Sequence, residues 1–280
     1  MGDKNKMMKR DVQMASTGVV MALLGACLIA CDTPPQPEAP DSNSPTVIRM
    51  LRVGVSETSP PVIFEEDGKV VGIEADLARA LGKALGCHVE FVSMFWPNLL
   101  LELHGGRIDM VMSGVSVTER RKARVAFASP YMTIGQQAMV RRTDMEVLGN
   151  VEAVLATRRR VGAEVGTTAM RFVHQRMGNA NIARFSTVVR AMAALDQGEI
   201  DVVVHDSPAI HWYAAKKFGG RLAAVPGVMT HESVAWAINK NNHQLLQEVN
   251  DVLAGWHGDG TLDAIVTRWL PDHVLGVDDP

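Results

Sequence analysis

Residues 113–131 read SGVSVTERRKARVAFASPY, and this short stretch combines a strand end, a turn lined by hydroxyl groups and an arginine. Ser116 and Thr118 alternate with valines, so their hydroxyls share one face of the predicted strand end. Thr118 is typical of a helix N-cap and places Arg121 in a first turn whose backbone N–H groups lack partners within the helix. This arrangement favours a carboxylate, because a planar guanidinium donates two parallel hydrogen bonds to it. The alternative is that residues 119–124 form a solvated basic face of a surface helix.

The segments around this stretch alternate between strand and helix patterns. Leu77, Leu81 and Leu85 repeat at i, i+4 and i+8, which predicts the buried face of a helix. Alternating strands and helices imply a mainly parallel sheet, and ligands bind such sheets at the carboxyl ends of the strands. A predicted strand that begins at Val70 precedes this helix, and a strand followed by a turn is predicted at 160–166. The other predicted strands fall at 51–55, 88–94, 108–114, 136–142, 182–186, 200–206 and 231–238, and two helices are predicted within 242–270.

Polar residues follow the predicted strands of the second half as well. Thr167, Thr168 and Ala169 begin a predicted helix whose first-turn N–H groups are free to contact an anion. The apolar strand 200–206 ends in His205 and Asp206, so we expect Asp206 to face the cleft. The alternative for Asp206 is an N-cap of the following helix, and the two roles are compatible.

The composition limits the classes of function. With 28 Lys+Arg against 31 Asp+Glu, the net charge of −3 argues against nucleic acid as a partner. Of three cysteines only Cys87 lies outside the first 31 residues, so no disulfide framework is expected there. The sequence contains no phosphate loop, dinucleotide fingerprint, zinc-protease motif or nucleophile elbow, and its histidines form no metal-like cluster. We therefore predict neither a cofactor nor a metal site.

The first 31 residues predict export and lipidation. Lys9 and Arg10 precede an apolar run at 18–30, which is shorter than the roughly 20 residues of a membrane span and suits a signal peptide. The run ends in Leu-Ile-Ala-Cys31, which resembles the bacterial lipobox and predicts Cys31 as the lipidated residue. Cys27 is a second candidate, and an uncleaved anchor is the alternative. Residues 32–48 are rich in proline and polar residues, which predicts a disordered tether.

Several ordered segments resemble one known family, the type 2 periplasmic solute-binding proteins of amino-acid ABC importers, solute-binding family 3. The resemblance covers nearly all of residues 50–271. It implies an α/β, two-lobe periplasmic-binding-protein type II fold, in which each lobe is a mainly parallel sheet flanked by helices and two hinge strands cross between the lobes. We assign 49–138 and 230–280 to lobe 1 and 139–229 to lobe 2. The matching segments are GVSETSPPVIF (54–64), GIEADL (72–77), WPNLLLELHGGRIDMVMSG (96–114), TERRKARVAFASPY (118–131), GTTAMRFV (166–173), ALDQGEIDVVVHDSP (194–208) and HGDGTLDAIVTRWL (257–270).

The resemblance also implies which residues contact a ligand. Arg121 matches the arginine that binds an α-carboxylate, and Asp206 matches the acid that pairs with an α-ammonium. Ser116 and Thr168 match positions that bind the carboxylate from opposite lobes. Trp96 matches an aromatic wall of the pocket, and the alternative is that it packs in the core. Ser113 and Gly114 match positions whose backbone contacts the ligand, and the alternative is that they only end a strand.

Two departures from the family pattern narrow the ligand. Ser59 stands where many members have an aromatic residue before the paired prolines, and Val62 stands where they have phenylalanine after them. Aromatic stacking on a long cationic side chain is therefore unavailable at these positions, which disfavours lysine and arginine. Ser59 is kept as a predicted contact, and a small or polar amino acid or another carboxylate is expected.

The resulting expectation is a monomeric, non-enzymatic binding protein, anchored by lipid to the inner membrane and facing the periplasm. Its expected partners are an amino-acid-like ligand and an ABC transporter permease. Asp32 resembles the signal that keeps some lipoproteins in the inner membrane. One alternative is a cyclohexadienyl dehydratase-like enzyme acting on prephenate or arogenate, because FWPN (95–98) and SGVS (113–116) resemble that class, although Ala169 stands where an acid or base is expected. The other alternative is a ligand sensor that docks on a membrane receptor.

Overall fold

The computed structural model describes residues 49–270. The predicted signal peptide 1–31, the lipidation site Cys31 and the predicted tether 32–48 lie outside the described residues. None of the helices in 49–270 has the length and apolarity of a membrane span.

The first sheet is built around β1 (Arg49–Val55), which pairs in parallel with β5 (Cys87–Ser93) and β6 (Met110–Val111). β15 (Ala237–Ile238) is antiparallel to β6, and β7 (Ala126–Phe127) is antiparallel to β15. Four of the five strands therefore run the same way, in the order β5-β1-β6-β15-β7. The sheet of the first lobe is mainly parallel, as predicted.

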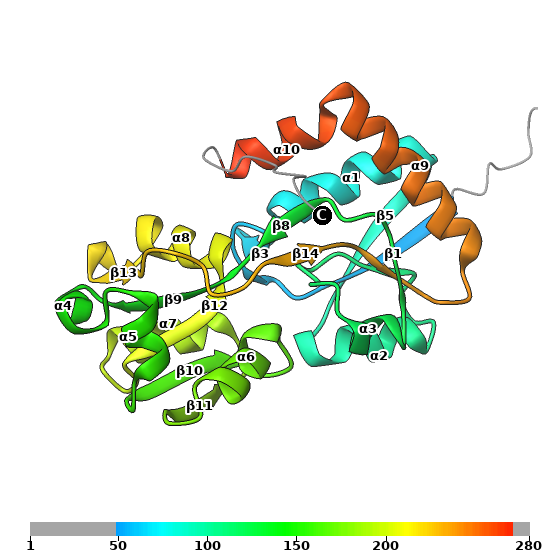
Figure 1. Ribbon diagram of the computed structural model, residues 1–280. Coiled ribbons are helices and arrows are strands. Elements are labelled where there is room, and N and C mark those ends of the chain that lie inside the picture. The colour runs from blue at the N-terminus through cyan, green and yellow to red at the C-terminus, as the bar shows by residue number, and fades with distance from the viewer. Residues whose placement is uncertain (1–48, 271–280) are drawn as a thin grey trace, which may run out of the picture. The chain divides into compact units, whose positions relative to one another are not determined.

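Helices bury both faces of this sheet (Figure 1). α1 (Ile73–Leu85), α9 (His243–Asp259) and α10 (Thr261–Trp269) share one apolar core with β1. The predicted leucine stripe of α1 is part of that core, and Leu77 and Leu81 are fully buried. α2 (Leu99–His104) packs on the other face with Val111 and Ala237 of the strands.

The second sheet repeats this plan with the order β11-β10-β12-β9-β13. β10 pairs in parallel with β11 and β12, whereas β9 is antiparallel to both β12 and β13, so four of the five strands again run one way. Its strands are β9 (Gln136–Arg141), β10 (Arg160–Glu164), β11 (Asn181–Phe185), β12 (Val202–Asp206) and β13 (Leu222–Ala224). Its helices are α4 (Met145–Leu148), α5 (Val151–Ala156), α6 (Thr168–Arg176), α7 (Val188–Asp196) and α8 (Ser207–Lys216).

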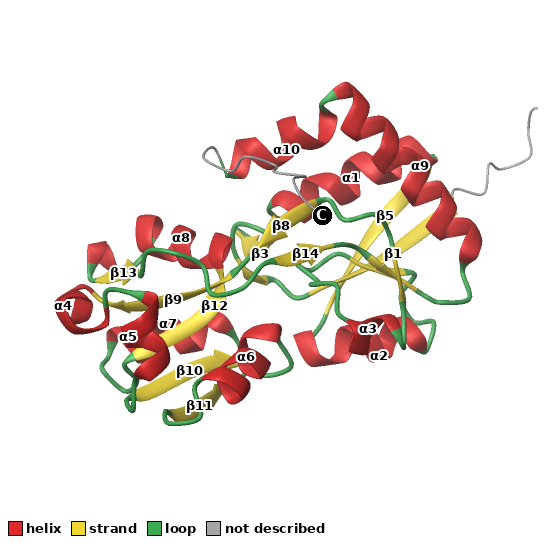
Figure 2. Ribbon diagram, in the orientation of Figure 1, coloured by secondary structure: helices red, strands yellow, loops and turns green. Residues whose placement is uncertain are grey.

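Two strands connect the lobes (Figure 2). β8 (Met132–Ile134) pairs antiparallel with β14 (Glu232–Val234), and β9 begins two residues after β8 ends. The second sheet thus begins at Gln136, three residues before the lobe boundary we assigned from the sequence. The predicted strand 231–238 is two strands, because β14 pairs with β8 while β15 pairs with β6 and β7.

The remaining elements are short. A small sheet, β2-β3-β4, carries the segment around the paired prolines. These elements are β2 (Thr58–Ser59), β3 (Ile63–Glu66), β4 (Lys69–Val71), α3 (Glu119–Lys122) and the 3₁₀ turns η1 (Trp96–Asn98), η2 (Arg142–Asp144) and η3 (Phe218–Gly220).

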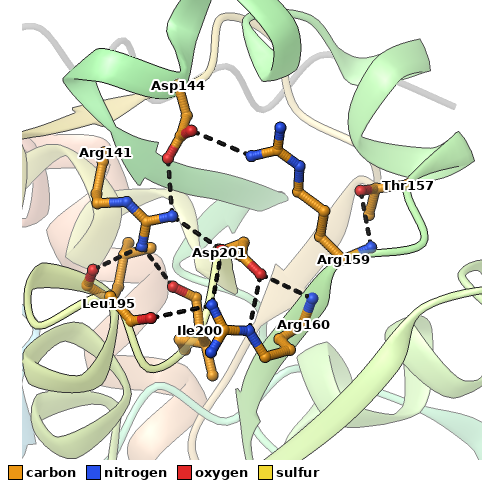
Figure 3. Close-up of polar contacts among 9 residues, drawn as sticks. Arg141, Asp144, Thr157, Arg159, Arg160, Leu195, Ile200 and Asp201 are labelled. Atoms are coloured by element: carbon orange, nitrogen blue, oxygen red, sulfur yellow. Dashed lines mark hydrogen bonds and ion pairs between the residues drawn. The ribbon is translucent and has the colours of Figure 1, made fainter.

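A network of ion pairs stabilises the end of the second sheet at which β10 and β12 begin (Figure 3). Asp201 accepts from Arg160 at 3.0 Å and from Arg141 at 2.9 Å. Asp144 joins the network through Arg141 at 2.9 Å and Arg159 at 3.1 Å. These residues lie where β10 and β12 begin, so the network leaves the carboxyl ends of the two strands free for a site.

Candidate functional site

The carboxyl ends of β6, β10 and β12 contribute to one cavity of about 20 Å³. Every ligand-contacting residue predicted from the sequence lies in its wall. The lining residues are Thr58, Ser59, Trp96, Ser113, Gly114, Ser116, Arg121, Glu164, Thr167, Thr168, His205 and Asp206. The roles of these residues toward a ligand remain predictions, and their placement around one space is what the structure adds.

Arg121 is buried, with 8% of its surface exposed, so the solvated alternative does not describe it. The Thr118 hydroxyl caps α3 by accepting from the Arg121 N–H at 3.3 Å, as the sequence predicts. The guanidinium donates from Nη1 to the Ser116 carbonyl at 2.8 Å. Within residues 49–270 it forms no ion pair with a carboxylate. A charged, buried fork of this kind suits an anion in the cavity.

The electrostatics of Arg121 follow from burial and from its neighbours. Burial lowers the pKa of Arg121 to about 10, because a charged group loses hydration there. The negative charges of Asp206 and Glu232 act in the opposite direction, while the positive charges of Arg171 and Arg120 add to the lowering. The guanidinium stays protonated at neutral pH and retains its full positive charge.

The hydroxyls of Ser116 and Thr168 lie 3.5 Å apart, although Ser116 belongs to the first lobe and Thr168 to the second. Thr168 is the first residue of α6, and Thr167 caps this helix by accepting from the Met170 N–H at 3.1 Å. Both predicted hydroxyls are buried. They therefore face the same small volume from its two sides.

Asp206 ends β12 and precedes α8, but its carboxylate makes no capping hydrogen bond to that helix. Instead it accepts from the Gln136 side-chain amide, with 2.6 Å between Nε2 and Oδ1. Burial raises the pKa of Asp206, and the positive charge of His205 and the bond from Gln136 act against that rise. The position is that of an N-cap, whereas the side chain is directed to the cavity.

Trp96, Ser113 and Gly114 form part of the wall contributed by the first lobe. The Trp96 indole donates to the Ser113 carbonyl at 3.4 Å, and Ser113 Oγ accepts from the Ser56 N–H at 3.0 Å. Gly114 has a φ of 65°, which favours glycine, and its N–H donates to Glu74 Oε2 at 2.6 Å. The backbone of residues 113–114 is thus fixed from behind the cavity.

Glu74 is the group behind that wall, and it is completely buried. Its other oxygen accepts from the Tyr131 hydroxyl at 2.7 Å. Burial raises the pKa of Glu74 to about 7, although the hydrogen bonds from Tyr131 and Gly114 favour the ionised form. Glu74 holds Gly114 in place without lining the cavity.

The sequence reasoning missed Glu164 and Thr58 as lining residues and gave His205 no role beyond its place at the end of a strand. Glu164 Oε2 lies 3.5 Å from His205 Nε2, and both side chains are buried. Burial alone lowers the pKa of His205, but Glu164 and Asp206 outweigh it and raise that pKa. Glu164 ends β10, just as Asp206 ends β12. Because ligands bind at the carboxyl ends of parallel strands, the sequence pattern could have predicted Glu164 as well.

The two positions that depart from the family pattern have different places in the structure. Val62 packs in the core of the first lobe and does not line the cavity, whereas Ser59 does. Among residues 49–270, no group of three or more His, Cys, Asp or Glu side chains is placed to hold a metal ion. The cavity combines one guanidinium with two carboxylates and several hydroxyls, a donor and acceptor set for a small zwitterion.

Comparisons with known proteins identify the family of this chain. A sequence model of the bacterial extracellular solute-binding proteins, family 3, matches residues 51–272. The L-cystine-binding protein TcyJ of Escherichia coli (strain K12) is 29% identical over 221 residues, which cover 79% of this chain and 82% of TcyJ. A probable histidine-binding protein of Neisseria gonorrhoeae is 31% identical over 236 residues, covering 83% and 86%.

Solved structures show the same fold. The ancestral amino acid-binding protein AncCDT-1, a precursor of cyclohexadienyl dehydratase, aligns with a TM-score of 0.73 and 33% identity over 79% of this chain and 94% of AncCDT-1. The two-lobe type II fold predicted from the sequence is confirmed by these relatives and by the two sheets described above. The chain belongs to the bacterial extracellular solute-binding proteins of family 3.

Proposed function

We propose that this protein captures a small amino acid or a related carboxylate outside the cytoplasm and delivers it to an ABC importer. The observation that carries the proposal is the meeting of Arg121 with Asp206 and Thr168 across one cavity. A positive group comes from the first lobe and a negative group from the second. Their opposite charges match the carboxylate and the ammonium of an α-amino acid.

The roles follow from the hydrogen-bonding capacity of each group. Arg121 binds the α-carboxylate with its fork, and the hydroxyls of Ser116 and Thr168 add one bond each. Asp206 pairs with the α-ammonium, and that pair is stronger in a closed site than on a surface. Trp96 covers one side, while Ser59, Ser113 and Gly114 border the rest of the space.

Binding requires the two lobes to separate first. A volume of about 20 Å³ holds roughly one water-sized sphere, which is far less than an amino acid needs. Within residues 49–270 the chain passes between the lobes at two places, beside the paired strands β8 and β14, and two such segments can serve as a hinge. The hydroxyls of Ser116 and Thr168 then approach the ligand from the two lobes as the cleft closes.

The ligand's side chain is the least constrained part of the proposal. Relatives are named for cystine, histidine and arginine, so the family accommodates polar ligands of different size and charge. Ser59 in the wall and Val62 in the core leave no aromatic surface at these positions to stack on a long cation. We therefore favour a polar or small amino acid, or another carboxylate, over lysine and arginine.

Delivery rests on the proposed lipid anchor. Lipidation of Cys31, with residues 32–48 as a tether, holds a monomeric binding protein at the periplasmic face of the inner membrane beside its permease. The sensor alternative needs the same anchor and differs in the membrane partner. Crosslinking in cells distinguishes the two alternatives. The importer role predicts ligand-dependent capture of a permease, and the sensor role predicts ligand-dependent capture of a receptor.

A dehydratase-like activity is the second candidate, and the observation in its favour is that Glu164 and His205 bring titratable groups to the cavity. The relative AncCDT-1 is a precursor of such an enzyme but is itself described as amino acid-binding. Ala169, at the position where an acid or base is expected, is fully buried and offers no proton. Incubation with prephenate and analysis for phenylpyruvate tests this candidate directly.

The proposal is tested by a thermal-shift screen against amino acids and small carboxylates. We expect a ligand to raise the Tm of the wild type and to have no effect on Arg121→Ala, whose unliganded Tm stays close to that of the wild type. Lys122→Ala is the matched control, because Lys122 is the exposed neighbour on the same helix and pairs with Glu119. Unchanged ligand binding by Arg121→Ala contradicts the proposed function.

A further inference from the structure

A second and larger cavity, of about 920 Å³, opens beside the site and shares Trp96, Arg121 and Thr167 with it. We call it the outer cavity. The first lobe contributes residues of η1, α2 and α3, and the second lobe contributes residues of α6. Every ionisable side chain that lines it is basic: His104, Arg120, Arg121, Arg124, Arg171 and His174.

The positive charge of the outer cavity is not neutralised by the protein. Within residues 49–270, Arg120, Arg124 and Arg171 form no ion pair with any carboxylate. Nearby basic residues differ, because Arg107 pairs with Glu102. Like charges gathered around one space repel each other, so an anion that enters the space relieves this repulsion.

The two cavities have opposite character on either side of Arg121. The inner cavity contains the carboxylates of Glu164 and Asp206, whereas the outer cavity contains none. Leu100, Leu101 and Met170 give the outer cavity apolar surface between its charged groups. A ligand that spans both therefore has an ammonium end, a carboxylate at Arg121, an apolar spacer and a second anionic end.

We propose that the ligand carries a second anionic group, a carboxylate at the end of a spacer, which binds in the outer cavity between Arg124 of the first lobe and Arg171 of the second. This inference rests on the proposed function, because it takes Arg121 and Asp206 as the site of the α-amino acid part. It assigns a ligand-binding role to two arginines that form no ion pair within residues 49–270. The ligand class is a zwitterionic dicarboxylate longer than a common amino acid.

The test compares matched ligands by isothermal titration calorimetry at low salt. L-2-aminosuberate and L-2-aminoadipate carry a second carboxylate, and L-2-aminooctanoate and L-norleucine have the same chain lengths without it. L-cystine, with two carboxylates, is a further probe. We expect at least one dicarboxylate to bind about tenfold more tightly than its matched monocarboxylate, with an advantage that declines as salt screens the exposed arginines.

Single variants locate the effect. We expect Arg124→Ala and Arg171→Ala each to remove most of this tenfold advantage and to leave monocarboxylate affinity within about twofold, because the second carboxylate needs charge-assisted hydrogen bonds from both arginines. Arg176→Ala is the control, since Arg176 is exposed on the same helix as Arg171 and does not line the outer cavity. Arg171→Lys should retain part of the advantage.

The outcomes separate this inference from the proposed function. If monocarboxylates and dicarboxylates bind equally well, or if the arginine variants weaken both equally, the second anionic group is refuted while the amino-acid site stands. If none of the probes and none of the amino acids binds, the proposed function fails and takes this inference with it. Arg121→Ala is expected to abolish binding of both ligand types.

Discussion

The guanidinium of Arg121 lies over the indole ring of Trp96, with 4.7 Å between Cζ and the ring centroid. The ring face attracts the cation and occupies one side of the planar group. The N–H donors at the edge of the guanidinium already reach the carbonyl oxygens of Ser116 at 2.8 Å and Gly166 at 3.5 Å. The donors that these two bonds do not use lie in the plane in which a carboxylate binds. Trp96 thereby orients the group that we propose binds the ligand.

Removal of this ring should weaken ligand binding without abolishing it. We expect Trp96→Ala to raise the Kd of the identified ligand about tenfold, since cation–π contacts contribute about 0.5 to 2 kcal/mol. Trp96→Phe keeps an aromatic face and should recover most of the loss. Calorimetric titration measures both, and an equal effect of the two variants contradicts a role for the ring face.

Neutralising Asp206 should have a larger effect. Asp206→Asn keeps an acceptor for Gln136 Nε2 but removes the charge that we pair with the ammonium, so we expect a loss of at least about 30-fold in affinity, corresponding to 2 kcal/mol or more. Asp196→Asn is the control, because Asp196 pairs with the exposed Arg221 on the same lobe and does not line the cavity. Unaltered affinity in Asp206→Asn refutes the pairing.

The proposed pairing of Asp206 with the ligand's ammonium predicts a pH dependence of binding. The carboxylate of Asp206 must be ionised to hold an ammonium, and its pKa is raised by burial. Affinity should therefore fall on acidification, at a pH above the ordinary value for aspartate. Titration of the Kd across the acid range checks this, with Asp206→Asn as the variant that lacks the dependence.

Much of the site was predictable because its residues follow a rule that the sequence displays. Thr118 is predicted as an N-cap and Thr167 as the start of a helix, and in the structure both residues are N-caps. Asp206 ends an apolar strand in the same way. Local patterns of this kind survive in the fold because backbone hydrogen bonding decides them within a few residues.

The contacts that depend on tertiary packing were less accessible. Gln136 donates to Asp206, Thr168 and Glu232, three residues that are distant in the sequence, and nothing in its own neighbourhood marks it. The outer cavity likewise joins Arg124 to Arg171 only because the two lobes fold side by side. The sequence suggested a solvated helix face for Arg124, and it contains no local pattern that brings α6 next to it.

Glu74 should make the stability of the protein depend on pH in an unusual direction. Its pKa is raised to about 7 in the folded state, so between pH 4.5 and 7 the folded state holds a proton that the unfolded state releases. Unfolding free energy therefore decreases as pH rises through this window, by about 3 kcal/mol at most. Urea unfolding of the wild type and Glu74→Gln at several pH values tests this, since the variant lacks this component. A difference between the two proteins that does not change with pH contradicts the raised pKa.

Asp201 should show the opposite dependence. Burial alone raises the pKa of Asp201, but hydrogen bonds from Arg160 and Arg141 outweigh it and lower the pKa to about 2. The ionised carboxylate therefore stabilises the fold above pH 3.8, and this contribution is lost as the pH falls toward 2. We expect Asp201→Asn to lower the unfolding free energy at pH 7 by about 1 to 2 kcal/mol, a figure reduced for solvent screening because Arg160 is partly exposed.

The comparison that isolates this effect uses urea unfolding and ligand titration together. Asp251→Asn is the control, because Asp251 is an exposed aspartate that accepts from Gln247 on the same helix. Ligand affinity should be unchanged in Asp201→Asn, since Asp201 lies where β10 and β12 begin and the cavity lies where they end. A loss of affinity without a loss of stability would show that the ion-pair network of the second lobe acts on the site. That result would contradict the expectation that the network and the cavity, at opposite ends of β10 and β12, are independent.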